Sequence, residues 1–315
     1  MQEDISPQEL FESDQDTLLI IGNGFDLDLG LNTRFLDFAE SDKWPFKNIS
    51  ANKQLGAYLN KCAKDSWFDL EHSMKSFCLE RSTLNSLKLY KQDFVESVRK
   101  DDALLNTGLV EYLEQAEKGK LDIDSYASKI LRECDQAINP PAIYSFNYTD
   151  LKTIARRLGY DFSIRVTYVH GSLQDKSIVL GFDEMKEIPG QLLFMSKSRR
   201  DRYSSSDLFD ALKKHKVIVF FGISFNIIDF GYFSDFFDGV STGRLKDKVI
   251  RVITLDETSH QDILNRISQN VNTSIFEINR YSDFKVIKTS GHSNSGEFQE
   301  LYNKINPEFS IDPRA

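Results

Sequence analysis

Glycines follow an apolar run near the start of the chain. The run Thr17–Ile21 carries no charge and ends in Gly22-Asn23-Gly24, which is typical of a buried parallel strand that enters a tight turn. Because glycine has no Cβ, backbone N–H groups here can approach a ligand phosphate, and the segment from Asp26 can supply the positive end of a helix dipole. The turn therefore predicts a nucleotide site. A plain strand-to-helix turn is the alternative, because the third glycine of the dinucleotide fingerprint is missing at its usual offset.

Polar residues or glycines follow three later strands in the same way. In an open parallel sheet, ligands bind outside the carboxyl ends of the strands. Together with the first glycine turn, these motifs would converge on one cleft that holds glycines, an amide, an imidazole and a hydroxyl. The three motifs are Asn147 after the strand at 142–146, His170-Gly171 after the strand at 165–169, and Gly222-Ile223-Ser224 after the strand at 216–221.

Strand patterns alternate with helical patterns along most of the chain, which predicts an α/β protein with a doubly wound parallel sheet. Between the first and second strands, apolar residues recur at helical spacing over residues 51–137. We expect about five amphipathic helices there, as a large insertion that forms a lobe or lid over the glycine turn. The prediction is one α/β domain over residues 1–315 with this helical insertion at 51–137.

The sequence pattern also predicts the positions of individual residues and short strands. Within the helical region, Asp69, Glu71 and His72 lie off the apolar stripe, so we expect them at the surface. We interpret His215 as a residue at the end of a helix and His292 as a loop residue. Further short strands are expected at residues 178–180, 274–278 and 285–288.

Composition and charge limit the classes of function. The chain has 315 residues and a formal net charge of -9, which disfavours a duplex nucleic-acid partner. Cys62, Cys78 and Cys134 form no Cys-x-x-Cys pair, which disfavours a disulfide framework and a zinc site. No signal sequence opens the chain, and no apolar run reaches the ~20 residues of a membrane span. We expect a cytoplasmic protein with no bound metal and no membrane association.

The motifs together resemble a known family. The stretch from Thr17 to Phe38 resembles the opening of bacterial abortive-infection proteins of the AbiH type. Later blocks agree, so that the resemblance spans about residues 17–237. It implies a role in antiviral defence by abortive infection. The later blocks are Trp67-Phe68-Asp69-Leu70-Glu71, Ser145-Phe146-Asn147-Tyr148-Thr149, His170-Gly171, and Gly222-Ile223-Ser224 with Asp229 and Tyr232.

The order of these motifs is also similar to the sirtuin-like NAD-binding fold, a Rossmann-like architecture. That likeness implies that Gly22 and Gly24 face the NAD pyrophosphate. It places Asn147 and His170 beside the nicotinamide ribose, and Gly222 with Ser224 at the adenosine side. Two features depart from protein-deacylating sirtuins, which carry a four-cysteine zinc ribbon and an Asp two residues after the Asn. This chain lacks the ribbon and has Thr149 at the second position, which favours an NAD hydrolase of the phage-defence kind.

NAD cleavage requires chemistry that these residue types can supply. Breaking the nicotinamide–ribose bond develops oxocarbenium character, so the site must orient the sugar and deliver a deprotonated water or hydroxyl. His170 is the candidate base, because imidazole titrates near neutral pH. The Asn147 amide is a candidate to hold the water or the ribose hydroxyls. Asp26 is a weaker candidate for ribose contact, and Asp229 for anchoring a loop; either carboxylate is as readily structural.

A second class of function competes with this hypothesis. The fold could serve as a catalytically inactive nucleotide-binding sensor or interaction module in phage defence. Release of nicotinamide from NAD would discriminate the two. A nuclease is disfavoured, because no carboxylate cluster has metal-ligand spacing. The expected partner is NAD or a related nucleotide. A phage-derived trigger or partner protein and a homo-oligomer are further alternatives.

Overall fold

The computed structural model describes residues 16–47, 54–64, 69–84, 92–183, 185–200 and 207–289. Its strands form one six-stranded sheet in the order β3-β2-β1-β4-β5-β6, and every pair of neighbours is parallel. The predicted α/β class with a parallel sheet is confirmed. The strands are β1 (Thr17–Ile21), β2 (Ala142–Ser145), β3 (Val166–Tyr168), β4 (Val217–Phe221), β5 (Lys248–Thr254) and β6 (Ser282–Lys288).

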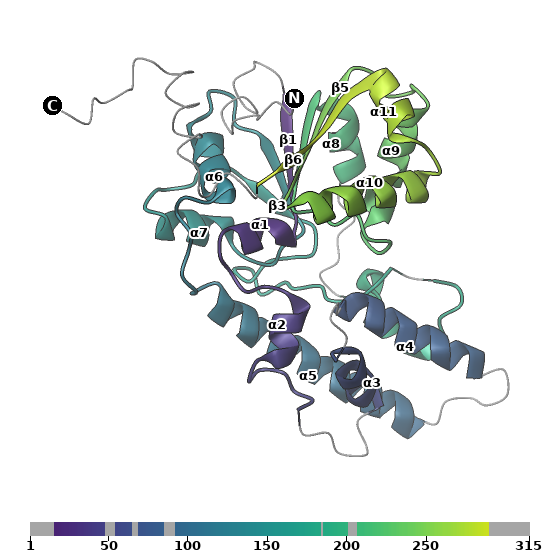
Figure 1. Ribbon diagram of the computed structural model, residues 1–315. Coiled ribbons are helices and arrows are strands. Elements are labelled where there is room, and N and C mark those ends of the chain that lie inside the picture. The colour runs from purple at the N-terminus through teal and green to yellow at the C-terminus, as the bar shows by residue number, and fades with distance from the viewer. Residues whose placement is uncertain are drawn as a thin grey trace.

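Helices cover both faces of the sheet, as Figure 1 shows. All five residues of β1 are buried, which explains why its sequence is continuously apolar rather than alternating. Leu19 and Ile21 pack into one core, and Leu18 and Ile20 pack into the core on the opposite face. The helices are α6 (Tyr126–Gln136) and α7 (Leu151–Arg157) on the first face, and α8 (Leu208–Lys214), α9 (Ser234–Ser241), α10 (Glu257–Val271) and α11 (Ile275–Tyr281) on the second.

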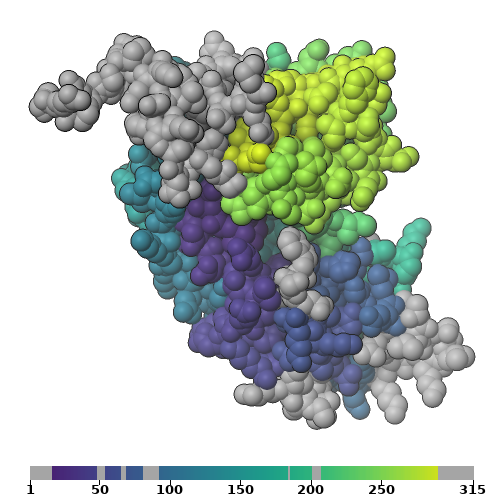
Figure 2. Space-filling model, viewed as in Figure 1, coloured from purple at the N-terminus to yellow at the C-terminus, as the bar shows by residue number. Residues whose placement is uncertain are grey.

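A third core lies outside the sheet and joins the helices that follow β1. Figure 1 shows α2 to α5 grouped beyond the end of β1 that leads into α1. In Figure 2, the purple segment that contains α1 and α2 runs along the surface from the sheet to these helices. The elements are α1 (Asn23–Asp28), α2 (Phe35–Glu40), α3 (Gln54–Cys62), α4 (Leu70–Leu84) and α5 (Gln92–Ala116), with the 3₁₀ helix η2 (Gly190–Met195) packed against them.

Two of the helices expected over residues 51–137 form one continuous helix in the structure. Val98 and Leu105, which the apolar spacing assigns to successive helices, both belong to a single helix, α5, of 25 residues. No glycine or proline separates those two residues, so nothing in the sequence ends the helix between them. Trp67, Leu87 and Tyr90, apolar residues at helical spacing in the same region, lie outside the described residues.

The strand predicted at residues 178–180 is wrong, because this segment lies outside the sheet. The Val179 N–H donates to the backbone oxygen of His170 at 2.9 Å, and side chains bond the carbonyl groups of the segment. The backbone oxygen of Leu180 accepts a hydrogen bond from Arg200 Nε at 3.1 Å, and that of Val179 accepts one from Tyr148 Oη at 3.5 Å. Leu180 itself is buried in the third core. Its apolar character therefore reflects packing against helices rather than pairing in a sheet.

The strand predicted at residues 274–278 is also wrong, whereas the one at 285–288 is confirmed within β6. Ser274 is the N-cap of α11, and its Oγ accepts a hydrogen bond from the Glu277 backbone N–H at 3.3 Å. A serine followed three residues later by glutamate is the sequence signature of a helix start. That local signal outweighs the β-branched residues of the segment.

Candidate functional site

The four strand-end motifs start from one edge of the sheet. Ile21 pairs with Ser145 on one side and with Phe221 on the other, and Ser145 also pairs with Tyr168. The last residues of β1 to β4 are therefore in register, at the carboxyl ends where parallel sheets bind ligands. The first predicted site residues after these four ends are Gly22, Asn147, His170 and Gly222.

Gly22 and Gly24 pack against the backbone of Gly222, the first residue after β4. A Cβ on Gly24 would lie 2.6 Å from Gly222 Cα, and a Cβ on Gly22 would lie 2.7 Å from Gly222 O. The Gly22 N–H donates to Phe221 O at 2.8 Å, and the Gly24 N–H donates to Gly222 O at 3.1 Å. The close approach of the β1 and β4 turns therefore accounts for these glycines. Contact of their N–H groups with a phosphate stays a prediction.

Asn23 is the exposed member of the glycine turn. Its Oδ1 accepts a hydrogen bond of 2.6 Å from Thr33 Oγ1, at the entry to α2. Because this bond uses the amide oxygen, the side-chain NH₂ of Asn23 is left as the donor at the turn. Asn23 thus presents a donor group at the surface, whereas the neighbouring glycine N–H groups donate inside the protein.

Asp26 lies at the centre of a buried polar cluster. Its side chain is 1% exposed, and Thr149 Oγ1 donates to its carboxylate at 3.0 to 3.1 Å. Burial raises the pKa of Asp26 to about 7, although hydrogen bonds from Thr149 and Asn147 oppose the rise. Among the described residues, no cation lies within ion-pair distance of Asp26. A buried carboxyl without a counter-ion that titrates near neutral pH is typical of functional sites.

Asn147 joins this cluster to the glycine turn. It is 6% exposed, and its Nδ2 donates to Gly22 O at 3.0 Å. Its backbone N–H donates to Ser145 Oγ at 3.1 Å, which fixes the residue directly beyond β2. The expectation of an amide at the strand edge is therefore met, in a position next to Asp26.

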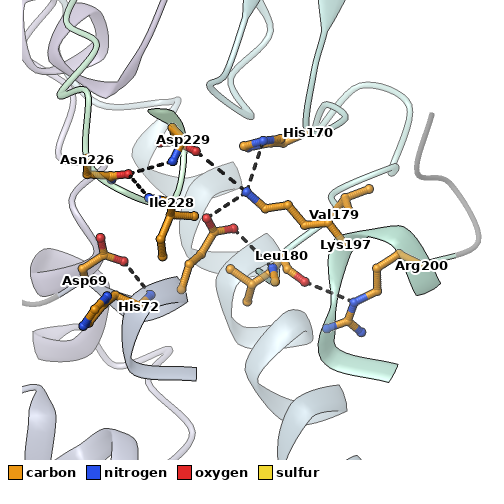
Figure 3. A network of polar contacts seen from close by, with 12 residues as sticks. Asp69, His72, His170, Val179, Leu180, Lys197, Arg200, Asn226, Ile228 and Asp229 are labelled. Carbon is orange, nitrogen blue, oxygen red and sulfur yellow. Dashed lines mark hydrogen bonds and ion pairs between the residues drawn. The ribbon is translucent and has the colours of Figure 1, made fainter. Parts of the chain in front are cut away.

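His170 lies in a second buried cluster, around the amino group of Lys197 (Figure 3). Lys197, in the 3₁₀ helix η3 (Lys197–Arg199), is fully buried. Its Nζ lies 3.2 Å from His170 Nε2, 3.0 Å from Glu71 Oε2 and 3.9 Å from Asp229 Oδ1. We call these four residues the Lys197 cluster. It brings together a strand end of the sheet and a helix, α4, of the third core.

Burial and charge set the protonation of the Lys197 cluster. Burial, and then the nearby ammonium of Lys197, lower the pKa of His170 well below its usual value. Burial alone would lower the pKa of Lys197, but the carboxylates of Glu71 and Asp229 outweigh it and raise that pKa. His170 is therefore neutral and Lys197 charged at neutral pH.

Aromatic rings enclose the imidazole of His170. The Phe146 ring lies edge-on at 5.3 Å between centroids, and the Tyr232 and Tyr148 rings lie at 5.9 and 6.5 Å. Phe146 and Tyr148 flank Asn147 in the chain, so the strand end that carries the amide also forms the wall around the imidazole. This arrangement accounts for the 4% exposure of His170.

The expectation that Glu71 lies at the surface is wrong. Glu71 is 7% exposed, and its Oε1 accepts a hydrogen bond from the Gly181 N–H at 3.2 Å. The helical spacing does carry a signal, because Glu71 precedes the buried Met74 and Cys78 by one and two turns of α4. Asp69 instead caps α4 by accepting from the His72 N–H at 2.9 Å, and His72 is exposed as predicted.

Lys197 was missed by the sequence reasoning. It lies in a stretch with Arg199 and Arg200, and such a run of basic residues is usually a solvated surface. No spacing in that stretch distinguishes the buried member from the others. Arg200 is also held inward, by a two-pronged ion pair with Asp102 of α5 at 2.8 and 2.9 Å.

The loop after β4 is held by its own polar groups. Asn226 Oδ1 accepts hydrogen bonds from the N–H groups of Ile228 and Asp229 at 3.0 and 2.9 Å (Figure 3). Ser224 O accepts one from Arg266 of α10 at 2.9 Å. These bonds place Asp229, whose side chain is 24% exposed, beside Lys197. Ser224 lies at the start of this loop, away from the contacts of the Lys197 cluster.

The described residues show neither a metal-binding cluster nor a membrane-spanning helix. No group of three or more His, Cys, Asp or Glu residues with metal-binding geometry occurs among them. None of the helices in the described part of the chain has the length and apolar character that crossing a bilayer requires.

Comparison with models of protein families identifies the family of this chain. The model of a family described as bacteriophage abortive infection AbiH matches residues 18–250. The chain belongs to the AbiH family. Its AbiH membership indicates a role in phage abortive infection, as the resemblance of its motifs implied. Comparisons with curated proteins and with solved structures gave no match. The matched AbiH region contains both buried clusters, because it extends from β1 into β5.

Proposed function

We propose that this AbiH protein is a cytoplasmic abortive-infection effector that binds NAD and hydrolyses it to nicotinamide and ADP-ribose. The observation that carries the proposal is the strand order β3-β2-β1-β4-β5-β6. It is the order of doubly wound, Rossmann-like sheets, which bind dinucleotides where the order reverses, between β1 and β4. In this chain the glycine turns of Gly22-Asn23-Gly24 and Gly222 meet at that point.

The residues at this edge supply more groups for the ribose hydroxyls of NAD than for its phosphates. Asp26 and Asn147 supply a carboxylate and an amide, which suit ribose hydroxyls. Asn23 supplies an exposed NH₂ donor for a phosphate, whereas the Gly22 and Gly24 N–H groups already donate to backbone oxygens. The phosphate contacts are therefore assigned to Asn23 first, and to the glycines only after a local change of the turn. Gly222 and Ser224 are assigned to the adenosine side.

His170 and Asn147 are the proposed catalytic residues. Asn147 would hold the ribose or the attacking water, and His170 would accept the proton of that nucleophile. In the structure, the lone pair of His170 Nε2 faces the Lys197 ammonium at 3.2 Å. Acceptance of a proton at Nε2 therefore requires that the contact with Lys197 be exchanged for one with the nucleophile. The helical insertion at residues 51–137 is proposed to form a lobe that covers this edge of a single domain.

A catalytically inactive nucleotide-binding module is the second candidate. The low pKa of His170, which burial and Lys197 produce, favours it, because a weakly basic imidazole is a poor proton acceptor. Under this alternative, NAD or a related nucleotide binds and stays intact. A phage-derived trigger or partner protein, or a homo-oligomer, would then carry the signal.

One experiment separates the two candidates. The purified full chain is incubated with NAD, nicotinamide and ADP-ribose are quantified by chromatography, and NAD affinity is measured by calorimetry. Stoichiometric release of both products supports the hydrolase. Binding of NAD without release supports the inactive module, and absence of both binding and release contradicts either form of the proposal.

A further inference from the structure

Lys197 has a position that needs an explanation. Its side chain is fully buried, yet it carries a charge, and burial of an ammonium costs several kcal/mol unless partners compensate it. The partners come from three separate segments: Glu71 from α4, His170 from the end of β3, and Asp229 from the loop after β4. Such convergence on a residue with no place in the proposed chemistry points to a role toward one of these partners.

The contact with His170 fixes the tautomer of the imidazole. An ammonium can only donate hydrogen bonds, so Nε2 at 3.2 Å must accept. A neutral imidazole that accepts at Nε2 carries its proton on Nδ1. Neutrality is consistent with the low pKa that burial and Lys197 impose on His170.

Glu71 fixes the position of the ammonium in turn. Its Oε2 lies 3.0 Å from Lys197 Nζ, while its Oε1 is held by the Gly181 N–H at 3.2 Å. The backbone N–H of Lys197 donates to Phe182 O at 2.8 Å, so both ends of the residue are held. The titratable groups facing the imidazole or its ion pair are Lys197, Glu71, Asp229, Tyr148 and Tyr232, with Asp69 and Asp183 next to the carboxylates.

We propose that Lys197 is a positioning residue that, anchored by Glu71, holds His170 as the neutral Nδ1–H tautomer with Nε2 on the ammonium. In this state the imidazole is a hydrogen-bond donor through Nδ1 and is protected from acting as a base through Nε2. The catalytic meaning of this state rests on the proposed function. The tautomer itself does not, because it follows from the contacts of Lys197 alone.

The test measures the tautomer and the protonation of the His170 imidazole directly, in the full chain without NAD. Nitrogen-15 correlation spectra of the histidine rings distinguish the two neutral tautomers, and His170→Gln identifies the signals of His170. The wild type should show the Nδ1–H pattern, with a His170 titration midpoint well below the ordinary pKa of an imidazole. In Lys197→Met, the midpoint of His170 should rise by ~1 pH unit or more and the Nδ1–H preference should be lost, because the adjacent positive charge is gone.

A second variant allows the test to be made even if Lys197→Met does not fold. Lys197→Met leaves the buried carboxylate of Glu71 without its cation, whereas Lys197→Met with Glu71→Gln removes both charges and keeps the packing. The double variant should show the same change at His170. An Nε2–H pattern in the wild type, or unchanged His170 signals in both variants, would overturn the proposal. The expected spectra from a protein that does not cleave NAD would support positioning by Lys197 and overturn the proposed function, so the two failures are distinguishable.

Discussion

Ionisation of Asp26 should make the stability of this protein depend on pH. Burial raises the pKa of this carboxyl from its ordinary value of 3.8 to about 7 in the folded chain. Between these two values the folded state binds a proton that the unfolded state does not, so stability falls as pH rises through this window. The full difference corresponds to ~4 kcal/mol, because each pKa unit is worth ~1.36 kcal/mol.

The substitution Asp26→Asn isolates this contribution. The neutral amide resembles the protonated carboxyl in shape and does not titrate, so the variant should lose the pH dependence that Asp26 causes. Between about pH 5 and about pH 8, the free energy of unfolding of the wild type should fall by ~3 kcal/mol relative to that of the variant. Urea unfolding at both pH values measures this difference.

Asp161→Asn is the matched control, since Asp161 is exposed in the segment that follows α7 and the same chemical change is made there. Its stability should follow that of the wild type at both pH values. A gap between wild type and Asp26→Asn that stays constant between the two pH values would refute the inference that a buried, unpaired carboxyl titrates near neutrality. If Asp26 also contacts ribose, Asp26→Asn should be more stable above pH 7 and yet bind NAD more weakly.

Three other predictions follow from the contacts described. Gly24→Ala should cost ~1–3 kcal/mol of stability, because its Cβ would lie 2.6 Å from Gly222 Cα. Gly190→Ala, which has open space around it, is the control and should cost little. Equal changes in the free energy of unfolding of the two variants, measured with urea, would contradict this prediction. Asp102→Ala should cost ~3–5 kcal/mol, because it leaves the partly buried Arg200 without its carboxylate, and an unchanged melting temperature would contradict this. Metal analysis of the purified protein should find no stoichiometric zinc, and one zinc per chain would refute the expectation drawn from the cysteine spacing.

The sheet and its edge were predictable because their signals are local. The uncharged run at Thr17–Ile21 and the glycines after it identify a buried strand and its turn without knowledge of any partner. The N-cap of α7 is a local signal of the same kind, because the Asp150 side chain accepts hydrogen bonds from the Lys152 and Thr153 N–H groups. The neighbouring Thr149 side chain donates to Asp26, a contact between distant segments that no local signal indicates.

The meeting of Lys197 with Glu71 and His170 was not predictable, because it joins segments that are far apart in the chain. A charged side chain such as Glu71 is buried only if another charge reaches it, and here that charge comes from a segment far along the chain. The sequence shows which residues could pair but not which segments meet. The strand expected at 274–278 is wrong for the opposite reason, because the signal that decides the structure there, the helix cap at Ser274, is local.

NAD turnover by His170→Ala and Asn147→Ala, measured beside the melting temperature, tests the central claim most directly. His72→Ala serves as control, because His72 is an exposed histidine on α4, outside the contacts of the Lys197 cluster. We expect the wild type and the control to release nicotinamide at similar rates. His170→Ala and Asn147→Ala should stay folded and lose ~10² to 10⁴ in kcat. A folded His170→Ala protein that cleaves NAD at the wild-type rate, or a wild type that releases no nicotinamide, would contradict the account.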